Sequence, residues 1–435
     1  MNSMKKLWKR ILCLALSAVL LLCACPALAQ EEVIEIDFWH HYPSGTGAEI
    51  MNEVLADFME LHPNIKVNQL GLGLGEQGEK LVPALVAGTA PDIFVYDLAT
   101  VQERAMKNQT MCLDEFVKDA GMDMTEYFPA TVDICTYDGK LYGLPYMTDT
   151  RVLFYNKDHF RAAGLDPEVA PKSWDEVLEY VEKLNITDEN GEATQVGFST
   201  IWWEIAPWTM GWTFGADYWD AENNPTLNTP EMVEALEYVI KLTDAVGADA
   251  FQKLFDASMA TGISPFTNGT VSMCVQFNGF CSTLETYAPE LDYGVALIPT
   301  SDGENNLASW GAGYSLEFCN RGEERAKAAF LLGQYLTSTE VATKFLLGNS
   351  EYVCNMNAYE DPSVASDPIW QVFAESGKYT RIHHFCPELP TWPNTALLPE
   401  WQAALLGTKT PKEAMDAAQQ NLLNEIENYR LLNGL

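Results

Sequence analysis

The chain has 435 residues, a hydrophobic content of 47% with twelve Trp, and a formal net charge of −35. This hydrophobic content excludes a disordered chain, and the length suffices for two domains of ~200 residues. The strong negative charge argues against nucleic acid or an anionic membrane surface as a partner, because both would be repelled.

The first thirty residues have the pattern of an export signal. Positive residues at positions 5–10 precede an apolar run over 11–23, and Ala27-Leu28-Ala29 supplies the small residues that signal peptidase reads. We predict a signal peptide over 1–29 and export to the periplasm or the extracellular face of the cytoplasmic membrane. A lipid anchor on Cys25 is the alternative, since Leu22-Cys23-Ala24-Cys25 resembles a bacterial lipobox. The apolar run is too short to span a bilayer comfortably.

The next segments alternate between short strands and amphipathic helices. The pattern predicts strands at 34–38, 65–70 and 93–96, and helices at 48–61 and 80–87. This spacing is typical of parallel sheets flanked by helices. Ligands of such sheets bind beyond the carboxyl ends of the strands, which places His40–Ser44 and Asp97 at the expected site.

Later helices are indicated by their start signals. A capping box is predicted at Ser173-Trp174-Asp175-Glu176. An N-cap and a first-turn proline are predicted at Thr229-Pro230, and a helix with one apolar face begins at Pro411. We find no internal repeat and no low-complexity linker, so two lobes would be joined by ordered crossings.

Two motifs suggest a cofactor or a metal but lack the right context. Gly73–Gly78 matches G-x-G-x-x-G, yet it follows the second strand of an exported protein, so we interpret it as a flexible turn. His40-His41 and His383-His384 are adjacent pairs whose members point to opposite sides of an extended segment. We therefore predict no metal and no cofactor.

Seven cysteines follow the predicted cleavage site, and no two of them form a CxxC motif. The odd number leaves at least one thiol free or paired with another molecule, and because the chain is large enough to fold without disulfides we assign no pairing. They are Cys112, Cys135, Cys274, Cys281, Cys319, Cys354 and Cys386.

Aromatic residues are concentrated in one part of the chain. Five Trp fall between positions 202 and 219, and Trp310 and Trp392 stand in segments that read as loops. Flat rings suit the C–H-rich faces of sugars, although we expect about half of these Trp to pack in the core. No serine nucleophile elbow, HExxH or P-loop is present, but the many carboxylates leave a glycosidase open.

Several short motifs occur in the order typical of one protein family. The chain resembles the family 1 extracellular solute-binding proteins of bacterial ABC importers, the group of maltose- and glycerol-3-phosphate-binding proteins. The motifs are Phe38-Trp39-His40, Ala90-Pro91-Asp92-Ile93, Leu113-Asp114-Glu115-Phe116, Tyr142-Gly143-Leu144-Pro145, Leu153–Asp158, Ala163–Pro167, Ser173–Glu176 and Tyr293–Pro299.

The resemblance implies an α/β, two-lobed type 2 periplasmic-binding-protein fold with a hinge and an interlobe ligand cleft. Lobe one would comprise residues 30–149 plus 299–345, and lobe two residues 150–298 plus 346–435. The crossings would fall near Thr148–Thr150, Leu297–Thr300 and Phe345–Tyr352. The family's partners are ABC permease subunits, and the receptor itself would be a monomer.

The resemblance also implies site residues and a ligand class. Asp97, the hinge positions Thr148 and Asp149, the glycines 311 and 313, and Tyr352 match positions used by the glycerol-3-phosphate receptors. Leu74 stands at their early tyrosine, and no arginine aligns with the one that holds the phosphate. Because a phosphate needs such a charged partner, we expect a neutral sugar or oligosaccharide instead.

We thus expect a non-enzymatic carbohydrate receptor, with a glycerophosphate or glycerophosphodiester receptor, a secreted glycosidase, and an adhesion or sensing protein as alternatives. Trp203, Trp212 and Trp310 would stack on sugar rings. Asp97, Asp149 and Asn278 would bond hydroxyls, and His41 and Tyr42 would line the wall of lobe one. The complete expected site is His41, Tyr42, Asp97, Thr148, Asp149, Trp203, Trp212, Asn278, Trp310, Gly311, Gly313, Tyr352 and Trp392.

Overall fold

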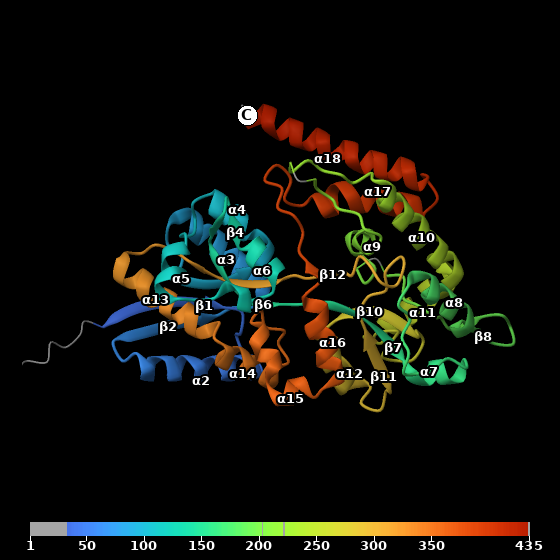
Figure 1. Cartoon of the computed structure of the whole chain (residues 1–435), viewed down its shortest axis with the longest axis horizontal. Coiled ribbons are helices and arrows are strands. Elements are labelled where there is room, and N and C mark those ends of the chain that lie inside the picture. The colour runs from blue at the N-terminus through green and yellow to red at the C-terminus, as the bar shows by residue number, and fades with distance from the viewer. Residues whose placement is uncertain (1–32, 202, 221, 434–435) are drawn as a thin grey trace, which may run out of the picture.

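The structure is a computed structural model that describes residues 33–201, 203–220 and 222–433. The predicted signal peptide and Cys25 lie outside the described residues. Among the helices that are described, none combines the length and the apolar character needed to cross a membrane. The described chain forms two α/β lobes that lie side by side, with the segments between them near the middle of the molecule (Figure 1).

Lobe one is built on a five-stranded sheet of order β2-β1-β3-β13-β6. β1 pairs in parallel with β2 and β3, whereas β13 is antiparallel to both β3 and β6. The three predicted strands of this region are confirmed. The strands are β1 (Ile34–His40), β2 (Ile65–Gly71), β3 (Ile93–Asp97), β6 (Gly143–Thr148) and β13 (Gly313–Phe318).

Helices cover this sheet, and both predicted ones are present. The predicted turn at Gly73–Gly78 is wrong, because Gly73 caps a helix that already starts at Leu74. The side-chain amide of buried Gln77 donates to the Val95 carbonyl, and this packing on β3 outweighs the poor helix propensity of glycine. The helices are α2 (Gly45–Leu61), α3 (Leu74–Ala87), α4 (Val101–Met106), α5 (Asp114–Ala120), α6 (Pro129–Ile134), α13 (Glu323–Leu336) and α14 (Thr339–Asn349).

Short elements complete lobe one. A hairpin of β4 (Thr136–Tyr137) and β5 (Lys140–Leu141) follows α6, and the 3-10 turns η1 (Leu98–Thr100) and η2 (Met124–Glu126) precede α4 and α6. η1 matters for the site, because it begins directly after Asp97 and carries the chain from the end of β3 into α4.

Lobe two has a smaller, antiparallel sheet, β10-β7-β11. The predicted capping box is formed by Ser173 and Glu176, and Thr229 caps α10 as expected. Its main elements are β7 (Arg151–Asn156), β10 (Met273–Phe277), β11 (Tyr293–Ala296), α7 (Lys157–Ala162), α8 (Trp174–Leu184), α9 (Pro207–Thr213), α10 (Pro230–Val246), α11 (Ala248–Met259) and α12 (Phe280–Tyr287).

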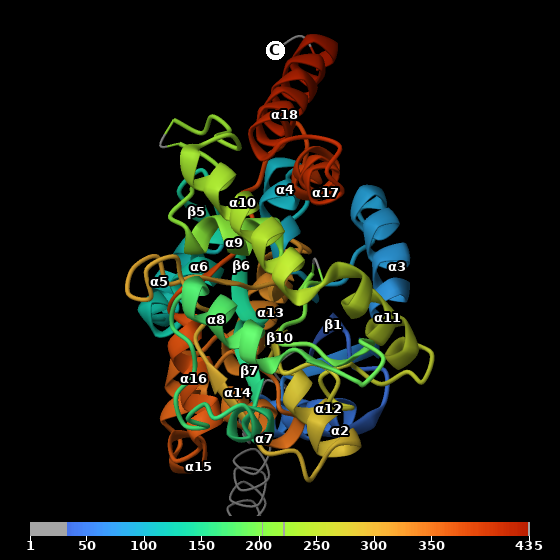
Figure 2. The same ribbon diagram turned by 90° about the vertical axis from the view of Figure 1, so that its right-hand side faces the viewer.

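The last quarter of the chain packs on both lobes and ends in α18, which runs along the outside of the molecule in both views (Figures 1 and 2). The remaining elements are β8 (Ile186–Thr187), β9 (Ala193–Gln195), β12 (Ser309–Trp310), η3 (Met356–Glu360), α15 (Pro362–Ala365), α16 (Pro368–Gly377), β14 (Thr380–Arg381), the π-helical turn η4 (Pro393–Leu397), α17 (Leu398–Leu405) and α18 (Pro411–Asn433).

The crossings between the lobes differ from the expected positions in two cases. The first lies at Thr148–Thr150, between β6 and β7. The second is displaced from residue 299 to Gly311–Gly313, because Thr300 pairs with Ser173 and β12 pairs with β14, both in lobe two. After α14, residues 352–354 still pair with β6 of lobe one, so the chain leaves that lobe later than residue 345.

A buried group of hydroxyls joins these crossings. The Thr150 hydroxyl lies 2.9 Å from that of Ser309, 2.9 Å from that of Ser376 and 2.6 Å from that of Thr380. Thr150 is completely buried. Because buried hydroxyls lose free energy unless they are paired, this arrangement holds the crossings in one geometry behind the site.

Candidate ligand-binding cleft

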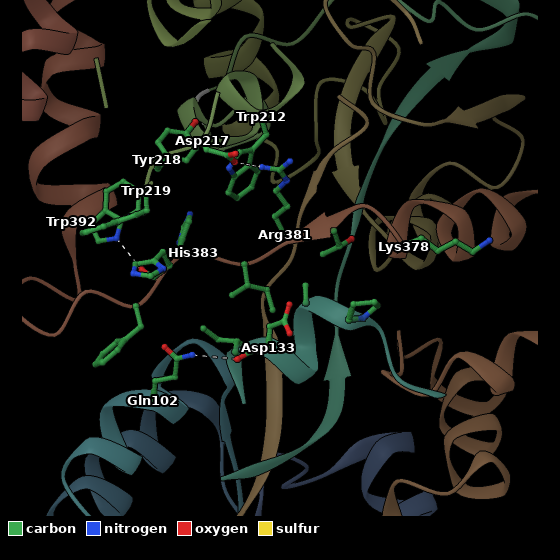
Figure 3. A pocket seen from close by; sticks show the side chains of 17 residues that line it. Gln102, Asp133, Trp212, Asp217, Tyr218, Trp219, Lys378, Arg381, His383 and Trp392 are labelled. Carbon is green, nitrogen blue, oxygen red and sulfur yellow. Dashed lines mark hydrogen bonds and ion pairs between the residues drawn. The ribbon is translucent and has the colours of Figure 1, made fainter. Parts of the chain in front are cut away.

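A cavity of about 470 Å³, here called the inner cavity, is lined by residues of both lobes. Lobe one contributes Gln102 from the first turn of α4 and Asp133 from α6, and lobe two contributes Trp212, Arg381 and further residues (Figure 3). Its size lies within the range of small-molecule sites. A ligand here would contact both lobes.

His383 stands at the centre of an aromatic group on the lobe-two side of the inner cavity. Its ring centroid lies 4.5 Å from that of Trp208, 5.6 Å from Trp310, 6.2 Å from Trp392 and 6.4 Å from Trp212. Burial, with the nearby positive charge of Arg151 as a smaller cause, lowers the pKa of His383 to about 4. The imidazole is therefore neutral at physiological pH. No sequence motif indicated this role, because Trp208, Trp212 and Trp310 are distant from His383 along the chain and only Trp392 is near it.

The expected residues Asp149 and Trp310 meet at Arg151. The Arg151 guanidinium donates to the Asp149 carboxylate at 3.1 Å and to the Trp310 carbonyl at 2.6 Å. Asp149 also accepts a 2.7 Å bond from the Ala312 amide. Arginine stacked on an indole is a favourable cation–π arrangement, and here the guanidinium carbon lies 3.8 Å from the centroid of the Trp310 ring.

A second arginine–aspartate pair borders the inner cavity. Arg381 donates to Asp217 at 2.7 Å, and its guanidinium lies 5.7 Å from the Trp212 ring centroid (Figure 3). Comparison with the family motifs indicated neither this arginine nor Arg151. Each cation is paired with one carboxylate, so neither presents an uncompensated positive charge to a ligand.

Asp97 follows β3 at the carboxyl edge of the lobe-one sheet, as predicted. Its carboxylate accepts the Ala99 amide at 2.9 Å, and the surrounding protein raises its pKa. Across the sheet it pairs with Tyr314 of β13. The expected residue His41 stacks on that tyrosine, with ring centroids 4.4 Å apart, and burial lowers the pKa of His41 to about 3.

The turn that carries Asp97 is held from behind by a buried ion pair. Arg104 donates to Glu317 at 2.7 Å, to the Asp97 carbonyl at 3.0 Å and to the Thr100 hydroxyl at 2.5 Å. Arg104 and Glu317 are 5% and 0% exposed. None of the sequence motifs predicted this ion pair or its contact with the Asp97 turn.

Two expected tyrosines lie in the core rather than on the cavity wall. Tyr352 is fully buried and donates its hydroxyl to the Phe373 carbonyl at 2.7 Å, so a ligand has no access to it. Its predicted contact with a ligand is therefore inconsistent with the structure. Tyr42 is 7% exposed, stacks on Phe345 and directs its hydroxyl to Met147 and Glu351. Both side chains stabilise lobe one.

The expected glycines and Thr148 shape the second crossing. A Cβ atom on Gly311 would lie 2.4 Å from Thr380 Cγ2, and Gly313 has a φ of +144° with the Met147 carbonyl 2.2 Å from the Cβ position. Only glycine fits at this close approach of two chain segments. The Thr148 hydroxyl donates to the Ala312 carbonyl at 2.7 Å, which ties the first crossing to the second.

The remaining expected residues occupy different environments. Trp392 lines the inner cavity, although it is only 1% exposed and its Nε1 donates to the His384 carbonyl. Trp203 is 44% exposed and meets Phe255 edge to face, away from the residues that line this cavity. Asn278 is 7% exposed, and its Oδ1 has no hydrogen-bond partner within the described part of the chain.

The residues that the structure describes form neither a metal site nor a disulfide bond. No group of three or more His, Cys, Asp and Glu side chains within those residues could hold a metal ion. The seven cysteines from Cys112 to Cys386 are all free thiols.

Known proteins with similar sequences are solute receptors. Residues 42–343 match the family model of the bacterial extracellular solute-binding proteins. The sn-glycerol-3-phosphate-binding periplasmic protein UgpB of Salmonella typhimurium (strain LT2) is 29% identical over 284 residues, which are 61% of this chain and 61% of that relative. The chain thus matches less than two thirds of the length of that relative.

Solved structures extend the similarity over nearly the whole chain. CpMnBP1 with mannotriose bound has 25% identity and a TM-score of 0.71, covering 90% of this chain and 100% of that one. A solute-binding protein of an ABC transporter from Thermotoga lettingae TMO, bound with α-D-tagatose, has 26% identity and a TM-score of 0.69 over the same shares. With its two lobes, its hinge crossings and a family match over most of its length, the chain belongs to the bacterial extracellular solute-binding proteins.

Proposed function

We propose that this protein is the extracytoplasmic receptor of an ABC importer, and that it captures a neutral carbohydrate between its lobes and delivers it to the permease. The main support for a neutral carbohydrate as ligand is the combination of aromatic rings with paired charges in and around the inner cavity. The rings of Trp212 and His383 line the inner cavity and suit sugar faces, and Trp310 stacks next to His383. Arg381 on the cavity wall is matched by Asp217, and Arg151 next to Trp310 is matched by Asp149.

The charges of the cleft argue against a phosphate. Arg151, Arg381 and the cavity-lining Lys378 are each engaged by a carboxylate, and Asp133 adds negative charge on the lobe-one wall. A phosphate binds most strongly to an arginine or lysine that has no competing anion. Arginine–aspartate pairs, by contrast, offer donors and acceptors side by side, which suits sugar hydroxyls.

The proposed contacts follow from this arrangement. Trp212 and Trp310 stack on sugar rings, and the Asp97, Asp149 and Arg381 side chains bond hydroxyls. Asn278 stays within the proposal as a polar contact on the lobe-two side, because its Oδ1 has no hydrogen-bond partner within the described residues. Trp203 is left out, because it lies apart from the residues that line the inner cavity. Since the contacts come from both lobes, they exist together only in the closed state, and ligand binding shifts the equilibrium towards closure.

A titration panel tests the ligand class. Thermal unfolding and calorimetry should be run with neutral mono- and oligosaccharides, glycerol-3-phosphate and glycerophosphodiesters. A ligand that binds only the folded state raises the unfolding temperature with its concentration relative to Kd. We expect stabilisation by a neutral sugar. Stabilisation by a glycerophosphate alone would refute the carbohydrate assignment in favour of the phosphate receptor.

Two further measurements test the receptor role itself. Chromatography of each bound sugar after long incubation should return it unchanged, whereas cleavage products would identify a glycosidase. In vesicles that contain the cognate permease, sugar should stimulate ATP hydrolysis only when this protein is present. If the protein and sugar together cause no stimulation, an adhesion or sensing role is favoured. The mass of the exported protein distinguishes cleavage before Gln30 from a lipid on Cys25.

A further inference from the structure

A second cavity of about 440 Å³, here called the outer cavity, adjoins the inner cavity. The two share four lining residues, Gln102, Trp219, His384 and Phe385, so they form one continuous groove. The groove starts at His383, next to Trp310, and ends under α18, where Ile426 and Arg430 line it. The two cavities measure about 470 and 440 Å³, which leaves room for more than one sugar ring.

The outer cavity repeats the chemistry of the inner one. Trp219 and His384 lie at the junction with ring centroids 4.5 Å apart, and Tyr137 supplies a further ring. The one arginine on its wall, Arg430, is held by Glu388 through bonds of 3.0 and 2.8 Å. Aromatic surface together with compensated charge again suits a neutral, hydroxyl-rich ligand.

A polar atom at the junction lacks a partner. The Nε1 of Trp219 is buried and makes no hydrogen bond to any residue that the structure describes. A buried indole N–H usually finds an acceptor, because leaving a buried donor unpaired is unfavourable. Trp219 lines both cavities, and a rotation of its ring on ligand binding would bring this donor to a ligand hydroxyl at the junction.

Both lobes build the outer cavity. Tyr137 and Asp138 come from the β4–β5 hairpin of lobe one, where Asp138 and Gly139 have φ values of +48° and +71° and form a tight turn. The opposite wall is made by α18 and residues 384–388 of lobe two. A ligand that fills this cavity therefore adds contacts that favour the closed state.

We infer that the receptor binds a linear oligosaccharide that extends from the inner cavity into the outer cavity, and that the outer cavity is a subsite that selects for chain length. This inference rests on the proposed carbohydrate function and deepens it. Tyr137 contacts the distal sugar rings from lobe one, and Arg430 with Asn224 contacts them from lobe two. A monosaccharide occupies the inner cavity alone and makes none of these contacts.

Calorimetric titration with three homologous series tests the inference. Malto-, manno- and cello-oligosaccharides should be compared from the monosaccharide to the pentasaccharide. For the series that binds, affinity should rise about tenfold or more once the chain reaches the outer cavity, which corresponds to about 1.4 kcal/mol. An affinity that stays the same from the shortest to the longest member would overturn the inference.

Two variants localise the effect. Tyr137→Ala and Arg430→Ala should each lower the affinity for the longest oligosaccharide by a factor about tenfold greater than for the monosaccharide. Arg430 has an exposed side chain near the end of α18, so its removal leaves the fold intact. Tyr287→Ala, at the exposed end of α12, is the matched control and should alter neither affinity. Equal losses for short and long sugars would show that the outer cavity is not a subsite.

The failure of the inference differs from that of the proposed function. If sugars bind but their affinity and the variants show no dependence on length, only the extended subsite is refuted. If no sugar in any series binds, the carbohydrate assignment fails, and the inference fails with it. The unfolding temperatures of all variants, measured in parallel, separate lost binding from lost folding.

Discussion

Arg151 covers the indole ring of Trp310, with its guanidinium carbon 3.8 Å from the ring centroid. Arg151 opens β7 just after the first crossing, and Trp310 stands just before the second. The same guanidinium binds Asp149 and the Trp310 carbonyl. One side chain thus holds an aromatic face, a carboxylate and two crossings in a fixed relation at the wall of the cleft.

Removal of this aromatic face should weaken sugar binding. Trp310→Ala is expected to lower affinity about tenfold or more, because the stacking surface and the support for Arg151 are both lost. Trp310→Phe keeps a ring and should lose less. Calorimetry measures both, and undiminished affinity of Trp310→Ala would remove this residue from the site.

The buried Arg104–Glu317 pair should support both stability and the position of Asp97. Arg104→Met leaves Glu317 buried without its partner, which typically costs about 3–5 kcal/mol. The double variant Arg104→Met, Glu317→Leu should recover much of this loss, because no unpaired charge remains. It should not recover sugar affinity, since the Asp97 carbonyl and the Thr100 hydroxyl still lack their donor. Denaturant unfolding and calorimetry separate the two effects. Full recovery of affinity in the double variant would contradict the positioning role.

The Thr150 hydroxyl should be needed for the stability of the crossings. Thr150→Val has a similar shape but leaves the hydroxyls of Ser309, Ser376 and Thr380 without a shared partner. We expect a loss of about 1–3 kcal/mol in the free energy of unfolding. Thr150→Ser retains the hydroxyl and is the matched control. A Thr150→Val variant as stable as the natural protein would show that the hydroxyl does not hold the crossings.

Glu204 should make stability depend on pH. It is completely enclosed by protein, Gln276 donates to it at 2.6 Å, and burial raises its pKa from 4.5 to about 7. The folded protein therefore holds this proton where the unfolded chain releases it. The stabilisation is fully present below about pH 4.5 and is lost as the pH rises through about 7, with a limit of about 3 kcal/mol.

Glu204→Gln tests this dependence, because the amide has nearly the same shape and does not ionise. The stability of the variant relative to the natural protein should increase as the pH rises from about 5 to about 8. Thermal unfolding across this range measures the difference, and Glu189→Gln on the exposed β8–β9 turn is the control. A pH-independent difference would mean that Glu204 does not change its charge in this range.

Local patterns in the sequence determined much of the fold. The alternation of apolar residues predicted β1, β2 and β3, and the capping residues Ser173 and Thr229 predicted where two helices begin. These features depend on a few neighbouring residues, so they can be read without the rest of the chain. Gly73–Gly78 was misread because the helix there is stabilised by packing on β3, which no local pattern contains.

The composition of the cleft was decided by the tertiary structure. The sequence indicated Asp97 through a strand end, Asp149 through the family resemblance and Trp310 through its loop-like segment. It could not separate Tyr352, which is buried, from residues that a ligand reaches. His383, Arg151 and Arg381 became visible as site residues only once segments more than a hundred residues apart were brought together. The wall of the cleft is made by side chains from distant segments of both lobes, and which face of a ring is exposed depends on those long-range contacts.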